Sequence, residues 1–305
     1  MKTALSRFAL LATGFISCLF LMLLSGFEDK PLAEEKSVQN INEHKWFAPA
    51  LPATIDFAGE AAPLDRWDVK EQLDREILFN YYEPGNILYM QKLASRYFPV
   101  IEEILRSHNV PDDLKYVCVA ESNLTNAISK AGAVGFWQFM KGTAPGYNIE
   151  VSETVDERYN VIKSTHAACT YLRQAYKRFG SWTAAAASYN CGMGRYQQNV
   201  THQQTSNYYD LVLPDETQRY IFRILAFKHL LTGSDSLGFA LPQVDRYASI
   251  KTRTLTVNSS IPDLASYARK NGSNYKMLKW HNPWLRARSL KAKPGKIYAI
   301  ILPAD

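Results

Sequence analysis

The feature that most constrains the fold is residues 111–233, where apolar side chains recur at helical spacing almost throughout. Glycines follow the predicted helix ends at Gly180, Gly192 and Gly233. Glycine commonly ends a helix because it adopts the left-handed conformation without strain. We predict helices over residues 111–122, 133–142, 158–179, 181–191 and 214–232. The fold class is therefore mainly α.

Helical spacing is also found earlier in the chain, over residues 69–97. Pro84 and Gly85 divide this stretch into two predicted helices. Pro99 is expected to begin another helix that ends near residue 109. With the segment described above, these helices predict one helical domain over residues 67–238.

The two flanking regions differ from this helical domain. Residues 28–66 contain four prolines and no sustained period, and we interpret them as a tether or lead-in segment. After residue 238 the pattern becomes strand-like at 253–257, helical at 261–270 and 274–281, and strand-like again at 297–302. This order predicts a small α+β unit of β-α-α-β type over residues 239–305, separate from the helical core.

The first 27 residues have the layout of an export signal. Lys2 and Arg7 precede an uncharged run over residues 8–24, and charged residues resume at Glu28. The run is long for a cleaved signal and short for a comfortable membrane span. We expect a cleaved signal peptide, with an uncleaved membrane anchor as the alternative. Either case predicts an exported protein of the periplasm or cell envelope.

The chain is basic, with a formal net charge of +6. This charge is compatible with nucleic acid, an anionic membrane or a polyanionic matrix such as a cell wall, and also with solubility alone. Dense runs of Lys and Arg interleaved with aromatic residues are absent from the sequence, so nucleic-acid binding is not expected.

Three cysteines follow the N-terminal segment, at Cys118, Cys169 and Cys191. An odd number prevents complete internal pairing, and their spacing matches no zinc-binding pattern. We expect small buried thiols, with one disulfide as the alternative. No metal or other cofactor is expected.

One carboxylate continues the apolar face of a predicted helix. Leu114, Val117 and Cys118 stand at positions i, i+3 and i+4, and Glu121 follows at i+7. A carboxyl group placed there loses hydration, so its pKa should rise unless a cation or hydrogen-bond donors compensate. A raised carboxyl pKa is what a general acid needs near neutral pH. The alternative is that Glu121, close to the helix end, turns out to solvent.

A glycine-containing segment, residues 132–140, offers chemistry suited to sugars. Trp137 and Phe139 provide flat apolar faces, and Gln138 provides both a donor and an acceptor. Sugars present apolar C–H faces surrounded by hydroxyl groups, so this combination fits them. The alternative is a glycine-rich turn with a packed tryptophan.

Two later segments add polar side chains at helix ends. Tyr189 and Asn190 lie at the end of a predicted helix, where their tips can line a cleft. Glu216 and Tyr220 open the last helix of the domain and share one face at i and i+4. The structural alternatives are close helix packing for the first pair and an exposed first turn for the second.

Taken together and in this order, these segments resemble the family 1 lytic transglycosylases over about residues 101–231, with the closest match in the membrane-bound branch. The matching residues are Glu121-Ser122 and residues 135–140, 155–165, 188–192 and 216–220. The resemblance implies a goose-lysozyme-like helical domain with Glu121 as its one catalytic residue. It also implies that sugar is held, or the acid oriented, by Ser122, Ser129, Gln138, Tyr189, Asn190, Glu216 and Tyr220.

The same resemblance implies that the substrate is the glycan strand of peptidoglycan. Glu121 would act as acid and then base at the bond between N-acetylmuramic acid and N-acetylglucosamine, with closure of a 1,6-anhydro ring. Most glycosidases use two carboxylates, and Asp210, Asp215 and Glu216 are candidates for a second by residue type only. The alternatives are a lysozyme-type hydrolase that uses water and a non-enzymatic peptidoglycan-binding protein.

The C-terminal unit has a resemblance of its own. Residues 263–283 resemble a divergent LysM module, a small peptidoglycan-binding unit, with residues 278–283 as the best-matching piece. The alternative is an appendage that only packs against the helical domain.

Overall fold

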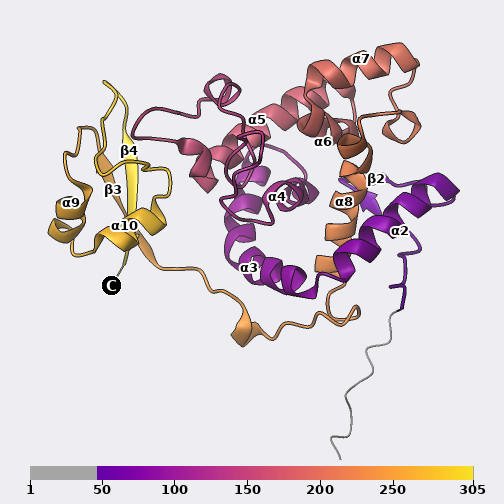
Figure 1. The fold of residues 1–305 in the computed structure, drawn as a ribbon, viewed down its shortest axis with the longest axis horizontal. Coiled ribbons are helices and arrows are strands. Elements are labelled where there is room, and N and C mark those ends of the chain that lie inside the picture. Colours follow the sequence, from indigo (N-terminus) through magenta and orange to yellow (C-terminus); the bar gives the residue numbers. More distant parts are fainter. Residues whose placement is uncertain (1–46, 305) are drawn as a thin grey trace, which may run out of the picture. The chain divides into compact units, whose positions relative to one another are not determined.

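Helices form the body of the protein between Trp67 and Thr232 (Figure 1). The computed structural model describes residues 47–304. The helices of the body are α2 (Trp67–Tyr81), α3 (Pro84–Ser107), α4 (Lys115–Ser122), α5 (Val161–Phe179), α6 (Trp182–Cys191), α7 (Met193–Gln203) and α8 (Asp215–Thr232). Short 3-10 helices stand between and after them, at Asp112–Leu114, Ala144–Tyr147, Glu157–Tyr159, Tyr208–Asp210 and Gln243–Asp245. The mainly α class predicted from the sequence is confirmed.

Helix α4 lies inside this body, and its position decides where its side chains can reach. It packs against α3 on one side and α8 on another (Figure 1). Leu114, Val117 and Cys118, the apolar stripe seen in the sequence, are fully buried. Helix α8 also contacts α2 and α6, so α4 and α8 together form the centre of the core.

The predicted helix over residues 133–142 is wrong. Residues 132–139 instead form turns joined by isolated bridges from Val134 to Ile128 and Phe139. The backbone takes positive φ at Gly132, Gly135 and Gln138, which a right-handed helix excludes. A periodic apolar pattern was present in the sequence, but the backbone conformation required by the tertiary structure overrides it.

The helix expected to begin at Pro99 is also wrong, because α3 is continuous from Pro84 to Ser107. Pro84 stands in the first turn, where its missing N–H costs nothing. Pro99 removes one hydrogen bond inside the helix, and the buried stripe that includes Met90 and Ile101 holds the helix on both sides of it. Helix α7 was not among the predicted helices.

Residues 48–66 are not the tether that their composition suggested. A short hairpin of β1 (Asp56–Phe57) and β2 (Glu60–Ala61) packs on the body, and Phe57 is fully buried. The Ala58 amide donates to Asp113 at 2.8 Å, and Lys228 of α8 also contacts Asp113. From Ala48 onward the chain forms one compact unit.

The export signal predicted for the first 27 residues lies outside the described residues. Among residues 47–304, no helix is long and apolar enough to cross a membrane. The cysteines at 118, 169 and 191 are free thiols, the first two buried and the third half-buried, as expected.

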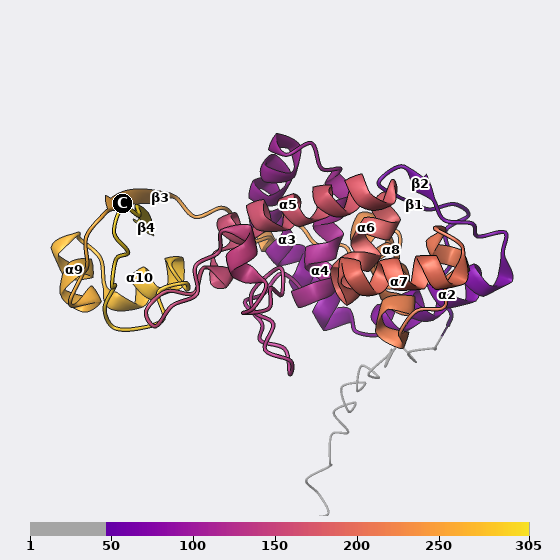
Figure 2. The same ribbon diagram turned by 90° about the horizontal axis from the view of Figure 1, so that it is seen from above.

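The C-terminal unit has the predicted β-α-α-β order. It consists of β3 (Thr252–Val257), α9 (Leu264–Lys270), α10 (Tyr275–His281) and β4 (Tyr298–Pro303). The two strands pair antiparallel, with Thr252 opposite Pro303 and Val257 opposite Tyr298, and they lie side by side in Figure 2. Asp263 and Asn274 cap the two helices through their side chains.

The sequence had suggested that this unit is separate from the helical body. The structure shows instead that the two share an apolar core. This core contains residues of the unit, such as Leu264, Leu278 and Ile300, and three residues of the body. These three are Val134, Val155 and Tyr159. A core shared in this way fixes the unit against the segments that surround the candidate active site.

Candidate active site

Glu121 lies one residue before the end of α4, at the centre of the helical body. Asn123 follows in the left-handed conformation and ends the helix. Because the preceding turn packs Val117 and Cys118 into the core, the carboxyl group leaves the helix among apolar side chains. The side chain remains partly accessible to solvent.

Burial raises the pKa of Glu121 from its ordinary value to about 7. The hydrogen bond from Tyr220 works in the opposite direction, the negative charge of Glu216 raises the pKa further, and the positive charge of Arg223 lowers it. Desolvation is the largest of these effects. The apolar stripe in the sequence had predicted this rise, and a carboxyl group with this pKa carries a proton on a large fraction of molecules near neutral pH.

Tyr220 holds the carboxyl group of Glu121. Its hydroxyl group donates to Oε1 of Glu121 at 2.5 Å, and the side chain is almost fully buried. Burial and the charge of Glu121 hold the pKa of Tyr220 well above its usual range, so the hydroxyl keeps its proton. Glu216, four residues earlier on α8, is exposed and affects Glu121 through its charge. Of the predicted pair, Tyr220 is therefore a buried residue that contacts Glu121, and Glu216 is an exposed residue that acts on Glu121 through its charge.

Tyr189 and Asn190 stand at the end of α6, which packs against α8. The Tyr189 hydroxyl donates to the Trp137 carbonyl at 2.7 Å, and its pKa is raised well above the usual range by burial and by the charge of Glu121. Asn190 accepts through Oδ1 from the Thr217 hydroxyl at 2.7 Å. Both side chains are partly exposed. Their positions are fixed by neighbours from two other segments.

The turns of residues 127–139 hold the other predicted polar residues. Gln138 has a φ of 48°, and its Nε2 donates to the carbonyls of Gly135 and Ala127 at 2.7 and 3.1 Å. Both hydrogen bonds that the Gln138 side chain donates are therefore made within the loop. Ser129 accepts through Oγ from the Ala133 amide at 3.0 Å. Both residues remain partly exposed.

Trp137 and Phe139 do not offer their faces to a ligand, contrary to the expectation. Trp137 is 0% exposed and donates through Nε1 to the Thr165 hydroxyl at 2.8 Å. Phe139 is also buried, with its ring against Tyr189. The two rings pack beneath the turns and support them from inside.

Ser122 also lies beneath the site. It is buried, and its hydroxyl donates to the Phe136 carbonyl at 2.8 Å. This bond joins the end of α4 to the turns that hold Gln138, so Ser122 fixes the loop relative to Glu121.

Of the three candidates for a second carboxylate, Glu216 is the one whose charge acts on Glu121. Asp210 forms an ion pair with Arg66. Asp215 opens helix α8 as an acid in its first turn. Among residues 47–304, Glu121 is thus the carboxyl group whose pKa is raised to about 7.

Three residues that shape the site were not predicted. Thr217 holds Asn190, Arg223 acts on Glu121 through its charge, and Arg158 bonds to the carbonyls of Gly132 and Phe139. Thr217 and Arg223 lie on α8 near Glu216 and Tyr220, so the helical pattern could have placed them close by. The sequence contains no comparable signal for the contact made by Arg158.

Comparison with known proteins matches two parts of the chain to family models. Residues 98–212 match the transglycosylase SLT domain, and residues 253–305 match the soluble lytic transglycosylase C-terminal LysM-like domain. The first match covers the described site residues up to Asn190, including Glu121.

Curated relatives agree with these matches. The chain is 29% identical over 214 residues to membrane-bound lytic murein transglycosylase D of Escherichia coli (strain K12), and to its counterpart in Escherichia coli O6:H1. This alignment covers 68% of the chain and 46% of the relative, so the chain spans about half the length of the curated relatives it matches.

Among solved structures, an inactive mutant of lytic transglycosylase Slt from Pseudomonas aeruginosa is similar to the chain. It is 22% identical, with a TM-score of 0.38, over 50% of this chain and 26% of that one. With the fold and the surroundings of Glu121 described, the chain is identified as one in which residues 98–212 match the transglycosylase SLT domain and residues 253–305 match the soluble lytic transglycosylase C-terminal LysM-like domain.

Proposed function

We propose that the protein cleaves the glycan strands of peptidoglycan as a lytic transglycosylase, with Glu121 as its acid and base. The observation that carries the proposal is one carboxyl group at the end of α4 that has a pKa of about 7 and accepts a hydrogen bond from Tyr220. The SLT domain over residues 98–212 supports the same activity.

In the first step, protonated Glu121 donates its proton to the glycosidic oxygen between N-acetylmuramic acid and N-acetylglucosamine. The bond from the muramyl anomeric carbon to that oxygen breaks, and the oxygen leaves as a hydroxyl group. The N-acetyl group of the substrate supports the positive charge that develops on the sugar. Tyr220 stabilises the carboxylate that remains on Glu121, because its hydroxyl donates to Oε1.

In the second step, the Glu121 carboxylate takes the proton from the muramyl C6 hydroxyl. The C6 oxygen bonds to the anomeric carbon and closes the 1,6-anhydro ring, so Glu121 ends protonated and no water is consumed. One carboxyl group that alternates between both forms needs a pKa near the working pH, which about 7 provides.

The products distinguish this reaction from hydrolysis by a lysozyme-type enzyme. Digestion of purified sacculi by the full chain is expected to release muropeptides that end in 1,6-anhydro-N-acetylmuramic acid. Mass spectrometry checks this, because each such product is lighter by one water than its hydrolytic counterpart. Muropeptides that carry the extra water would assign the protein to the hydrolases, and no release at all would make it a binding protein.

The surroundings of Glu121 also predict how the rate varies with pH. The first step needs protonated Glu121, so kcat/KM should fall as the pH rises through about 7. Burial sets most of this pKa, and the opposing charges of Glu216 and Arg223 adjust it. The fall of kcat/KM at high pH is the alkaline limb of the pH profile. Removing the charge of Glu216 and removing the charge of Arg223 should therefore move this limb in opposite directions.

We expect Glu216→Gln to shift the alkaline limb to lower pH and Arg223→Met to shift it to higher pH. Each shift should be roughly 0.3–0.5 pH unit at low salt and smaller at high salt, since Glu216 is exposed and its charge is screened. Profiles of kcat/KM against pH on soluble glycan strands measure both. Shifts in the same direction would mean that another group controls this limb.

The location and partners follow from the same proposal. Peptidoglycan is the proposed substrate, and the cell envelope is the compartment that contains it. The curated relative is membrane-bound by its name, and we propose that this chain is exported to the periplasm, with a cleaved signal or a membrane anchor at its N-terminus. Fractionation of cells that produce the full chain tests this.

A further inference from the structure

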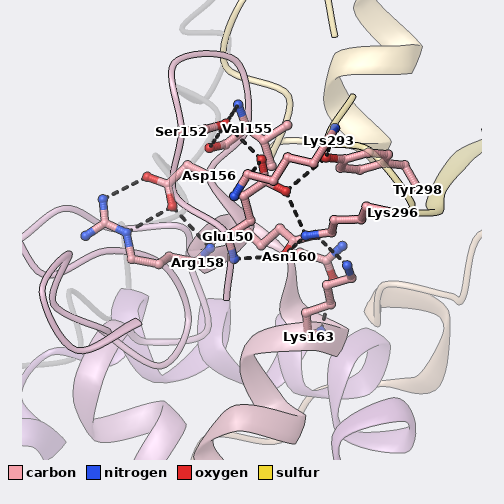
Figure 3. A network of polar contacts seen from close by, with 11 residues as sticks. Glu150, Ser152, Val155, Asp156, Arg158, Asn160, Lys163, Lys293, Lys296 and Tyr298 are labelled. Atoms are coloured by element: carbon pink, nitrogen blue, oxygen red, sulfur yellow. Dashed lines mark hydrogen bonds and ion pairs between the residues drawn. The ribbon is translucent and has the colours of Figure 1, made fainter. Parts of the chain in front are cut away.

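A network of buried charges joins the helical body to the C-terminal unit (Figure 3). It is centred on Glu150 and Glu157, whose residues are only 6% and 1% exposed. The Glu150 amide donates to Oε2 of Glu157 at 2.9 Å, and the Glu157 amide donates to the Glu150 carbonyl at 2.8 Å. The segment of residues 149–160 is thereby folded back on itself, with two carboxylates inside.

Both the C-terminal unit and the helical body supply cations to these carboxylates, and Lys296 of the C-terminal unit contacts both of them. Nζ of Lys296 lies 2.7 Å from Oε2 of Glu150 and 2.9 Å from Oε2 of Glu157. The Tyr298 hydroxyl donates to the same Glu150 oxygen at 3.0 Å (Figure 3). Lys163 of α5 pairs with the other carboxylate oxygen of Glu157, Oε1. Lys293 also lies 3.6 Å from Glu150, but Lys296 is the one cation among residues 47–304 that contacts both carboxylates. Removing one partner of a buried ion pair is strongly destabilising, so we expect the conformation of this segment to depend on Lys296.

The contacts of Glu150 lower its pKa despite burial. Burial alone would raise it, but hydrogen bonds from Lys296, Ser152 and Tyr298 outweigh the burial and lower it. The same contacts raise the pKa of Lys296 against its own desolvation. Both groups therefore remain charged around neutral pH.

Backbone pairing holds the same two parts together. The Asp156 amide donates to the Trp284 carbonyl, and the Arg286 amide donates to the Thr154 carbonyl, both at 2.8 Å. The Arg286 side chain lies over the ring of Tyr159 at 4.0 Å. The C-terminal unit thus adds an extended strip of contacts to residues 154–159.

Arg158 transmits this arrangement to the active site. Its guanidinium forms two hydrogen bonds with Asp156, at 2.9 and 2.7 Å, and is buried. Its NH1 donates to the carbonyls of Gly132 and Phe139, both at 3.1 Å. These carbonyls stand at the two ends of the turns that hold Gln138, so one side chain closes the loop.

The loop also meets the C-terminal unit directly. Val134, between the two carbonyls bonded by Arg158, is buried in the core of that unit. Gly135 follows at φ 86°, against the Arg158 carbonyl. Residues 132–139 are therefore held from one side by α4 and from the other by residues 149–160 and the C-terminal unit.

We propose that the C-terminal unit is a positioning part of the active site. Lys296 and Tyr298 hold residues 149–160 in place, and Arg158 passes this constraint to the loop of residues 132–139 that carries Gln138. The expected effect of the C-terminal unit on the rate rests on the proposed glycan cleavage. Its expected effect on the conformation of residues 132–139 rests on the geometry alone. It differs from the role of a wall-binding module attached by a tether, because removing one lysine from it should alter the catalytic step.

The test is Lys296→Met in the full chain, with Lys291→Met as the matched control. Lys291 belongs to the same unit and pairs with Glu153, but both side chains of that pair are largely exposed. On soluble, uncrosslinked glycan strands we expect Lys296→Met to lower kcat about 10- to 100-fold with little change in KM, because a small misplacement of reacting groups has this effect. Lys291→Met should match the unchanged protein, and Lys296→Arg should recover most of the rate.

Hydrogen exchange provides a second readout that does not depend on activity. In Lys296→Met, amides of residues 132–139 should exchange at least 10-fold faster while those of α8 stay unchanged, well below the melting temperature. Wild-type kcat together with unchanged exchange in the loop would overturn the proposal, as would a uniform rise in exchange across the chain. If the wild-type chain cleaves no glycan, the proposed function fails but the exchange experiment still decides the coupling.

A milder variant covers the case in which Lys296→Met does not fold. Tyr298→Phe removes one hydroxyl, the donor at 3.0 Å from Glu150, and leaves the ring in place. Faster exchange confined to residues 132–139 and 149–160 supports the coupling. Exchange at the wild-type rate in both segments contradicts it.

Discussion

Replacing Glu121 by glutamine is expected to lower the rate of glycan cleavage by at least about 10²–10⁴-fold. The upper part of this range applies because the same carboxyl group serves as acid in the first step and as base in the second. Glutamine has nearly the same shape, and its amide oxygen can still accept from Tyr220, which donates at 2.5 Å in the unchanged protein. The release of soluble muropeptides from purified sacculi measures the effect.

The melting temperature of the same variant shows whether a lower rate comes from loss of the catalytic group or from loss of the folded structure. The pKa of Glu121 is about 7 in the folded protein, above its ordinary value of 4.5. The folded state therefore binds the proton more tightly, and the stability that this provides is lost as the pH rises from about 4.5 through 7. At pH 8, Glu121→Gln should melt at the same temperature as the unchanged protein or higher.

A surface variant completes this comparison. Glu103→Gln removes an exposed carboxylate on α3 and should change neither the rate nor the melting temperature. A stable Glu121→Gln protein that digests sacculi at the unchanged rate would show that the acid lies elsewhere, and Glu216 would be the next residue to replace.

The sequence predicted the raised pKa of Glu121 because the responsible signal is local. The stripe of Leu114, Val117 and Cys118 lies within two turns of the carboxyl group, and helical periodicity alone aligns the four residues. Raising the pKa needs little more than this apolar environment, since desolvation is its largest cause. The contribution of Tyr220 depends on how α4 meets α8, which periodicity does not determine.

The same reasoning failed for residues 133–142, where the deciding contacts are distant in sequence. Trp137 bonds to Thr165, and the loop ends bond to Arg158. A sequence pattern shows that an aromatic residue is present but not which side of a loop its ring will occupy. The buried position of Trp137 and the shared core around Val134 both arise from parts of the chain that lie far along it.

Gly135→Ala is expected to destabilise the protein far more than Gly132→Ala, although the two glycines lie in one loop. Both have positive φ, 86° and 83°, so an alanine at either position bears the left-handed strain of about 1–2 kcal/mol. At Gly135 a Cβ would stand 2.0 Å from the Arg158 carbonyl oxygen, whereas at Gly132 it would meet nothing within 4 Å. A backbone atom cannot rotate away as a flexible side chain can, so the loop or residues 156–159 must shift.

Forcing such a shift in a packed region costs roughly 1–3 kcal/mol beyond the strain, so Gly135→Ala should lose about 2–5 kcal/mol of unfolding free energy and Gly132→Ala about 1–2 kcal/mol. Urea denaturation followed by circular dichroism measures both. Activity should follow the same order, because Gly135 accepts from Gln138 and its displacement moves that side chain relative to Glu121. Equal losses for the two variants would mean that the close approach of Arg158 to the loop is absent in solution, and with it the route by which residues 149–160 hold the active site.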